Sequence, residues 1–270
     1  VALATAQEKG LYRSLLPIDS ANGSQIEISG RKYLNFSSNN YLGLNTHPYV
    51  KQITRKALEA WGAGSGASRL LSGSLKIHHD LEDKIAAFKN EEAAIVFSSG
   101  YLANLGAVTA LINNEDLIVA DRLSHASLID AAKLTGAKLL IYPHRDMMAL
   151  EKLLERARNF RRCIILTETY FSMDGTVAPL EALFHLSKKY EAILMVDEAH
   201  ATGVFGKKGA GLTEQFGLTG KIDIVMGTLS KALGSVGGYV AGNKTLKAYL
   251  TNRSKSFIYT TAPSPLASSS

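Results

Sequence analysis

Lys231 is the residue in this sequence whose type and surroundings are best suited to chemistry. It lies in a short polar turn after the apolar run 222–226, and Gly234, Gly237 and Gly238 follow it. A lysine just past a buried strand can be partly desolvated, which lowers its pKa and makes its amine a nucleophile towards aldehydes. A single turn lysine is usually solvated, so a chemical role depends on what other strands bring to it.

From residue 93 onward the sequence alternates apolar strand patterns with helical patterns. Strands are predicted at 93–97, 117–120, 138–142, 163–167, 193–196, 222–226 and 238–241, and helices at 102–112, 126–134, 147–158, 180–190 and 244–253. This alternation is typical of a mostly parallel sheet covered on both faces. We therefore predict an α/β fold with a mostly parallel seven-stranded sheet, whose ligands bind beyond the carboxyl ends of the strands.

Polar side chains follow five of these predicted strands. The first is followed by a helix start, which binds phosphate through its free N–H groups. The candidate site residues, in strand order, are Ser99, Gly100 and Tyr101, then His125, then Glu168 and Ser172, then Asp197 and His200, then Thr228 and Lys231. Because the strand ends are expected to meet at one rim, we predict that these residues form one site.

Several other functions are disfavoured by missing motifs. Asp197 opens the run Asp-Glu-Ala-His, which is also the Walker B signature of DEAH-type ATPases, but the sequence has no P-loop. A metal site from His200, Asp197 and His125 lacks tight ligand spacing, so no metal is predicted. A serine-hydrolase elbow, Gly-x-Ser-x-Gly, is also missing.

Pyridoxal phosphate chemistry fits the predicted set. It needs a Schiff-base lysine, an acid that keeps the ring nitrogen protonated, a phosphate cup and a group against the ring face. Lys231, Asp197, the helix start at 99–101 and His125 match these four needs in turn. His200, three residues after Asp197, can reach the ring hydroxyl.

Composition indicates a cytoplasmic protein that binds small molecules. The 270 residues are 46% hydrophobic and 20% charged, and the 30 Lys and Arg outnumber the 24 acids without forming a basic run. We therefore predict no nucleic-acid partner and read the charge of +6 as suited to a polyphosphorylated substrate. No apolar stretch has transmembrane length. The single cysteine, Cys163, lies in an apolar run and argues for a buried thiol in a reducing compartment.

Five stretches resemble the α-oxoamine synthases, pyridoxal phosphate enzymes of fold type I. They are Leu34–Gly43, Asp121–Ser127, Phe171–Gly175, Val196–His200 and Thr228–Lys231. The resemblance implies decarboxylative condensation of an amino acid with an acyl-CoA. It also implies that Lys231 carries the cofactor, that Asp197 pairs with the ring nitrogen, and that His125 stacks on the ring.

The resemblance further assigns roles outside the strand ends. Arg13 would meet a substrate carboxylate and Asn40 would lie near the substrate. Ser172 would bond the cofactor, and Thr260 or Thr261 would reach the phosphate of the neighbour in a homodimer with shared sites. The expected organisation is an arm (1–45, with a helix over about 4–15 and a hairpin), a cofactor-binding domain (46–254) and the start of a linker (255–270). The family's smaller C-terminal domain is expected to be absent from this chain.

The loops 64–73 and 259–265 favour the branch that condenses L-alanine with pimeloyl-CoA in biotin biosynthesis. Glycine C-acetyltransferase, 5-aminolevulinate synthase and serine palmitoyltransferase activities stay open as alternatives within the family. A homologue that binds the cofactor without catalysing a reaction is the alternative from a different class.

Overall fold

The computed structural model describes residues 2–270. Contacts within the chain define two compact units, which divide after Ser38. Residues 255–270 belong to the second unit together with the sheet. Each unit is described by itself below.

The first unit contains one helix and one antiparallel hairpin: α1 (Ala2–Glu8), β1 (Gln25–Ile28) and β2 (Arg31–Leu34). Ser29 and Gly30 join the strands with φ of 50° and 74°. Positive φ at both central residues is the type I′ turn, whose twist matches that of a hairpin. The predicted extension of the helix to about residue 15 is wrong, because Gly10 adopts a φ of 65° and ends it.

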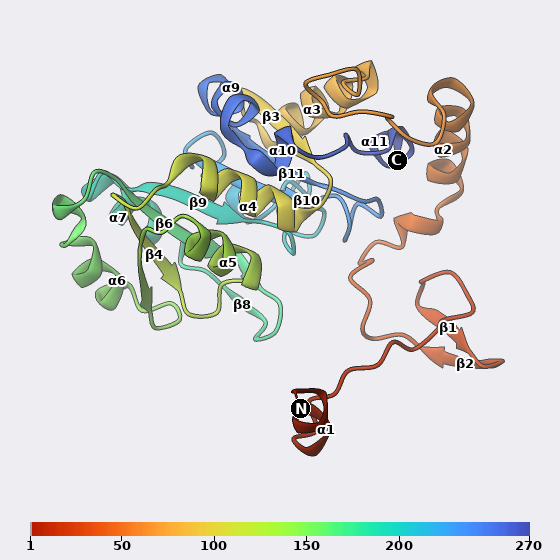
Figure 1. Ribbon diagram of the computed structural model, residues 1–270, viewed down its shortest axis with the longest axis horizontal. Coiled ribbons are helices and arrows are strands. Elements are labelled where there is room, and N and C mark those ends of the chain that lie inside the picture. Colours follow the sequence, from red (N-terminus) through yellow and green to blue (C-terminus); the bar gives the residue numbers. More distant parts are fainter. Residues whose placement is uncertain (1) are drawn as a thin grey trace. The chain divides into compact units, whose positions relative to one another are not determined.

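Seven strands form the central sheet of the second unit, in the order β3-β11-β10-β9-β6-β4-β5 (Figure 1). Their bounds are β3 Ala93–Phe97, β4 Leu117–Asp121, β5 Lys138–Tyr142, β6 Cys163–Glu168, β9 Ile193–Asp197, β10 Ile224–Thr228 and β11 Gly238–Gly242. Strand β11 is antiparallel to both neighbours, and the other pairs are parallel. The predicted fold class is thereby confirmed.

Four strands extend one residue beyond their predicted ends, and one strand is displaced by two residues. The run expected at 222–226 forms β10 two residues later, because Asp223 does not join the ladder. Its carboxylate accepts the N–H of Leu194 (2.9 Å) and pairs with Lys188 (3.1 Å). The later start brings Thr228 to the carboxyl end of the strand.

Helices and short elements occupy the rest of the second unit. The helices are α2 Pro48–Trp61, α3 Lys76–Lys89, α4 Gly100–Leu111, α5 Ala126–Leu134, α6 Met147–Leu154, α7 Leu180–Lys189, α8 Leu212–Gln215, α9 Lys244–Arg253, α10 Lys255–Ile258 and α11 Pro265–Ser269. Leu44–Thr46 and Ala157–Asn159 are 3-10 turns, and β7 (Tyr170–Phe171) pairs with β8 (Thr176–Val177). The predicted helix at 147–158 is thus shorter, since α6 ends at Leu154.

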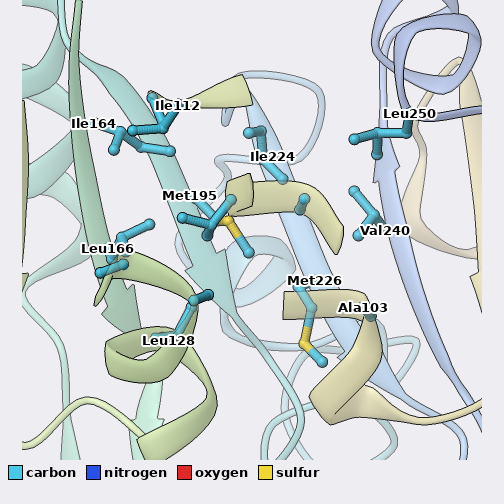
Figure 2. Packing of buried hydrophobic residues seen from close by; sticks show 14 of the residues in the cluster. Ala103, Ile112, Leu128, Ile164, Leu166, Met195, Ile224, Met226, Val240 and Leu250 are labelled. Atoms are coloured by element: carbon cyan, nitrogen blue, oxygen red, sulfur yellow. The ribbon is translucent and has the colours of Figure 1, made fainter. Parts of the chain in front are cut away.

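Strand alternation decides which side chains face which helices. Successive side chains of a strand point to opposite faces of the sheet. In β9, Met195 packs in the cluster with residues of α4 and α5, whereas Leu194 and Val196 pack in the cluster with α6 and α7. Figure 2 shows Met195 and Met226 among side chains that include Ala103 of α4 and Leu128 of α5. Asp197, two residues after Met195, therefore lies on the α4 face.

Two sequence expectations, one about membrane-spanning helices and one about Cys163, can be compared with the structure of residues 2–270. Within 2–270, every helix is too short or too polar to span a lipid bilayer. Cys163 is a buried free thiol at the start of β6, and burial raises its pKa to about 12. The thiol therefore stays protonated near neutral pH and is a poor nucleophile.

Candidate active site

A cavity of about 240 Å³ lies at the carboxyl ends of the parallel strands on the α4 face. Most residues around it come from the predicted set. Its lining residues are Ser99, Gly100, Tyr101, Asn104, His125, Ser127, Glu168, Asp197, Ala199, His200, Met226, Thr228, Ser230 and Lys231. The structure thus brings five strand ends to one cavity, as the alternating pattern predicts.

Lys231 reaches this cavity from the loop between β10 and β11. Gly234 and Gly237 adopt φ of 69° and 134° there, which lets the loop turn back into β11. The Nζ atom of Lys231 lies 2.8 Å from Nε2 of His200. Burial lowers the pKa of this lysine, and the charges of Asp197 and Glu168 only partly oppose that effect. An amine with a lowered pKa is what imine formation requires.

His200 is held as a neutral imidazole between two partners. Its Nδ1 lies 2.6 Å from the hydroxyl of Tyr41, and its Nε2 contacts Lys231. Burial and the charge of Lys231 lower the pKa of His200 to about 4. When the Lys231 ammonium donates to Nε2, the remaining ring proton lies on Nδ1 and is donated to the Tyr41 oxygen. Burial also raises the pKa of Tyr41, which favours the hydroxyl as a neutral partner.

Asp197 ends β9 with both carboxylate oxygens engaged. One oxygen accepts the amide N–H of Asn104 on α4 at 2.8 Å, and the other accepts the backbone N–H of Ala199 at 2.8 Å. Its exposed fraction is 5%. A buried carboxylate that accepts two N–H groups is fixed in orientation.

Glu198, the second acid of the Asp-Glu-Ala-His run, points into the core instead. Its carboxylate pairs with the buried Lys89 (2.7 Å) and accepts the backbone N–H of Thr213 (2.8 Å). Its side chain is fully buried, so this acid cannot position a water for hydrolysis of a nucleotide. Instead, the ion pair anchors the chain between Asp197 and His200, because breaking a buried pair costs about 3–5 kcal/mol.

His125 begins α5 and uses its own ring to cap that helix. Its Nδ1 accepts the backbone N–H of Ser127 (3.2 Å) and lies 2.8 Å from the Ser127 hydroxyl. The hydroxyl in turn accepts an amide N–H from Asn104 (2.9 Å). The imidazole is therefore fixed at the rim of the cavity by α4 and α5 together.

Glu168 ends β6 directly beside Asp197, its register partner in β9. It is 7% exposed. Burial, with the negative charge of Asp197 as the next cause, raises the pKa of Glu168 to about 8. Glu168 therefore holds a proton near neutral pH, beside the Asp197 side chain.

The raised pKa of Glu168 predicts a pH-dependent gain in stability for Glu168→Gln. Between the ordinary pKa of 4.5 and about 8, the folded protein keeps a proton that the unfolded chain has released. Stability of the wild type should fall as pH rises through this window, by about 1.4 kcal/mol per unit, and Glu168→Gln should lose that fall. Urea unfolding of both proteins at pH 5, 6.5 and 8 measures the free energy of unfolding.

The exposed Glu155→Gln is the control for this comparison. Its unfolding midpoint should follow that of the wild type at all three pH values. A constant difference between Glu168→Gln and the wild type from pH 5 to 8 would show that Glu168 is charged throughout.

The start of α4 forms a concave, donor-rich wall of the cavity. The Ser99 hydroxyl accepts the N–H of Leu102 (3.2 Å), while the N–H groups of Gly100 and Tyr101 have no acceptor within the helix. A Cβ on Gly100 would lie 3.1 Å from the methyl carbon of Met226, and one on Gly238 would lie 2.6 Å from Gly100 Cα. Glycine at both positions keeps this wall open, and N–H groups at a helix start attract anions.

The remaining predicted site residues do not line the cavity in this chain. Ser172 is exposed in the turn between β7 and β8. The side chain of Asn40 bonds that of Asn45 (2.6 Å). Thr261 forms a bridge with Ser68, and its neighbour Thr260 precedes that bridge. Arg13 belongs to the first unit. Their cofactor and substrate roles stay predictions.

Among the residues without a predicted role, three bond Asp197, His125 or His200 through their side chains, namely Asn104, Ser127 and Tyr41. Asn104 is four residues after Gly100, so helical spacing places it on the same side of α4. Ser127 and Tyr41 lie inside stretches 121–127 and 34–43 but received no role. All three residues are visible in the sequence, but their roles depend on which strand end each side chain faces in the fold. No cluster of His, Cys, Asp and Glu able to hold a metal is found within residues 2–270.

The fold and the site together define an α/β protein with a partly desolvated lysine and a fixed carboxylate on adjoining strands. A family model for aminotransferase class I and II matches residues 31–270. The 8-amino-7-oxononanoate synthase of Citrifermentans bemidjiense is 51% identical over 269 residues, and that of Geobacter sulfurreducens is 48% identical over 263. The alignments cover 99% and 97% of this chain and 69% and 67% of those proteins.

Solved structures of related enzymes are similar to this chain as well. The serine palmitoyltransferase of S. paucimobilis, solved with a bound PLP–myriocin aldimine, aligns with a TM-score of 0.93 at 31% identity, over 99% of this chain and 68% of that one. The 8-amino-7-oxononanoate synthase of Francisella tularensis aligns with a TM-score of 0.76 at 32% identity, over 87% and 65%. The chain belongs to the aminotransferase class I and II family and, within it, to the α-oxoamine synthases. It spans about two thirds of the length of these relatives.

Proposed function

We propose that this chain is the cofactor-binding part of a pyridoxal phosphate-dependent 8-amino-7-oxononanoate synthase. The reaction condenses L-alanine with pimeloyl-CoA and releases CoA and CO2. The observation that carries the proposal is identity of 45–51% to proteins of that name over nearly the whole chain. The site geometry supports it, since Lys231, Asp197 and His125 share one cavity.

The cavity fits pyridoxal phosphate on three independent features. Lys231 offers an amine with a lowered pKa for attachment. The cavity wall at Gly100 is concave, and a Cβ at this position would fill the space. The free N–H groups of this wall suit a phosphate. Asp197 is a buried carboxylate with fixed oxygens, suited to a protonated ring nitrogen. When bound, the cofactor supplies an aldehyde for imine formation and a ring that withdraws electrons from the substrate Cα.

Each residue then has a defined task. The Lys231 amine would hold the cofactor and, when not attached to it, would take the proton from the substrate Cα. Its lowered pKa suits it to act as a base near neutral pH. His200, neutral, orients that amine through its Nε2. Asp197 holds the proton on the ring nitrogen, because a buried ion pair favours the charged forms of both partners. His125 would lie against the cofactor ring, and Ser99, Gly100, Tyr101 and Thr228 would hold its phosphate.

Further parts of the proposal concern assembly and location. We propose a homodimer in which Thr260 or Thr261 reaches the phosphate in the neighbouring subunit, with Arg13 and Asn40 near the substrate and Ser172 near the cofactor. A cytoplasmic location is proposed because the single cysteine is buried and unpaired, as suits a reducing compartment.

The sister activities and the non-catalytic alternative can be separated by amino-acid binding. The protein loaded with pyridoxal phosphate is titrated separately with L-alanine, glycine and L-serine, and its visible absorption is recorded. We expect L-alanine to change the spectrum at the lowest concentration, although one methyl group discriminates only by about 1–3 kcal/mol. CoA release from pimeloyl-CoA then separates an enzyme from a cofactor-binding homologue. Tightest binding of glycine or L-serine would move the assignment to a sister enzyme.

A further inference from the structure

We propose that Asn104 is a positioning residue that couples Asp197 to His125 and keeps the proton of His125 on Nε2. The amide of Asn104 is the only group among residues 2–270 that bonds both the Asp197 carboxylate and the Ser127 hydroxyl. The meaning of this coupling for catalysis rests on the proposed function, whereas the bonding itself does not.

The orientation of the Asn104 amide follows from its neighbours. A carboxylate oxygen can only accept hydrogen bonds, so the atom 2.8 Å from Asp197 is the amide nitrogen. Its second hydrogen points to the Ser127 hydroxyl at 2.9 Å. The amide oxygen is left buried and has no partner in the described part of the chain, although Asn104 is only 1% exposed. A buried polar atom without a partner is rare, and commitment of both amide hydrogens explains it.

The proton position on His125 follows in the same way. The backbone N–H of Ser127 can only donate, so Nδ1 of His125 must carry a lone pair. The Ser127 hydroxyl accepts from Asn104 and can therefore direct its own hydrogen to the same Nδ1, 2.8 Å away. Both contacts require an unprotonated Nδ1. The neutral ring then carries its proton on Nε2.

The hydrogen bonds from Asn104 to Ser127 and from Ser127 to His125, called the relay below, give His125 a defined chemical role at the rim of the cavity. Because Nδ1 is occupied by Ser127, Nε2–H is the donor that the ring can offer to a substrate carboxylate or a developing oxyanion. A fixed donor needs no reorganisation when charge develops, which is the basis of electrostatic stabilisation in active sites. Asn104 sets this direction through Ser127 while it holds Asp197, so one helix residue aligns two groups of the site.

Nitrogen NMR of the protein without cofactor tests the relay directly. The two ring nitrogens of His125 in 15N-histidine-labelled protein have different chemical shifts when protonated and unprotonated, and His125→Asn assigns the signals. We expect the wild type to show a protonated Nε2 and an unprotonated Nδ1. Ser127→Ala removes the 2.8 Å hydroxyl contact and leaves only the 3.2 Å backbone N–H on Nδ1, and Asn104→Leu frees the hydroxyl to turn away, so both should increase the Nδ1–H population. Ser127→Thr, which keeps the hydroxyl, should restore the wild-type pattern.

Thr109→Val is the matched control, since it removes a hydroxyl of the same helix, α4, that bonds the Leu105 carbonyl. It should leave both His125 shifts unchanged. A proton on Nδ1 in the wild type, or unchanged His125 shifts in both relay variants, would overturn the proposal.

Kinetics of the loaded enzyme then separate the relay from the proposed function. Asn104→Leu and Ser127→Ala should lower kcat for CoA release about 10–100-fold with little change in KM for L-alanine, as expected for loss of an interaction made in the transition state. Absence of CoA release in the wild type would refute the proposed function and leave the NMR result standing. Normal kcat in both relay variants would refute the relay alone.

Discussion

Lys231→Ala is expected to abolish covalent attachment of pyridoxal phosphate and to lower CoA release by at least about 10³-fold, because no other lysine lines the cavity. Treatment with borohydride reduces an imine to a stable amine. In the wild type, mass spectrometry should then find the cofactor on the peptide that contains Lys231. In Lys231→Ala, that peptide should be unmodified, and the visible spectrum should be that of the free aldehyde.

Lys221→Ala provides the control, because Lys221 is exposed and lies just before the same strand, β10. Its reduced peptide map and CoA release should equal those of the wild type. Retention of the cofactor on another lysine in Lys231→Ala, with unchanged turnover, would refute the assigned role. In that variant His200 loses Lys231 as a partner but stays a neutral imidazole, which needs no compensating charge near neutral pH.

Asp197→Asn is expected to lower CoA release by about 10²–10³-fold, similar to the loss of a single preorganised electrostatic group. The substitution conserves shape but removes the negative charge that keeps the ring nitrogen protonated. Cofactor affinity should fall about 10–100-fold, since hydrogen bonds to a charged group contribute about 1.5–3 kcal/mol. Equilibrium titration with pyridoxal phosphate, followed by the visible band, measures the affinity.

A second consequence of Asp197→Asn concerns its neighbour. With the carboxylate charge gone, the like-charge part of the shift at Glu168 disappears, so the pKa of Glu168 should fall but stay raised by burial. The control is Asp116→Asn, a buried carboxylate at the opposite end of the sheet that pairs with Arg161 (2.7 Å). It should lower stability without changing cofactor affinity. Equal losses of affinity in the two variants would mean that Asp197 acts only through folding.

Several features of this protein follow from local sequence pattern. The apolar runs fixed the strands to within two residues, because a buried parallel strand requires a near-continuous apolar stretch. The same pattern predicted which polar residues follow strand ends. Nine of the ten strand-end candidates line one cavity, and only Ser172 does not. Glycines that end helices or open turns, such as Gly10 and Gly234, also act locally.

Other features depend on contacts between residues far apart in the sequence. Lys89 and Glu198, 109 positions apart, form a buried pair that withdraws the second acid of the Asp-Glu-Ala-His run from the cavity. The pKa of Glu168 is raised by burial and then by the charge of Asp197, which lies beside it because β6 and β9 are neighbours. The partners lie too far apart in the sequence for any local pattern to predict these pairings.

The sequence by itself determined the alternation of strands and helices and the chemical types at the strand ends, since both are local properties of the chain. Only the tertiary structure decided which of those groups meet, which are charged and where their protons lie. Lys231 has a lowered pKa because it is buried, and His125 presents Nε2–H because Ser127 and Asn104 occupy its other side. Burial and hydrogen-bond direction are set by packing, which no local pattern specifies.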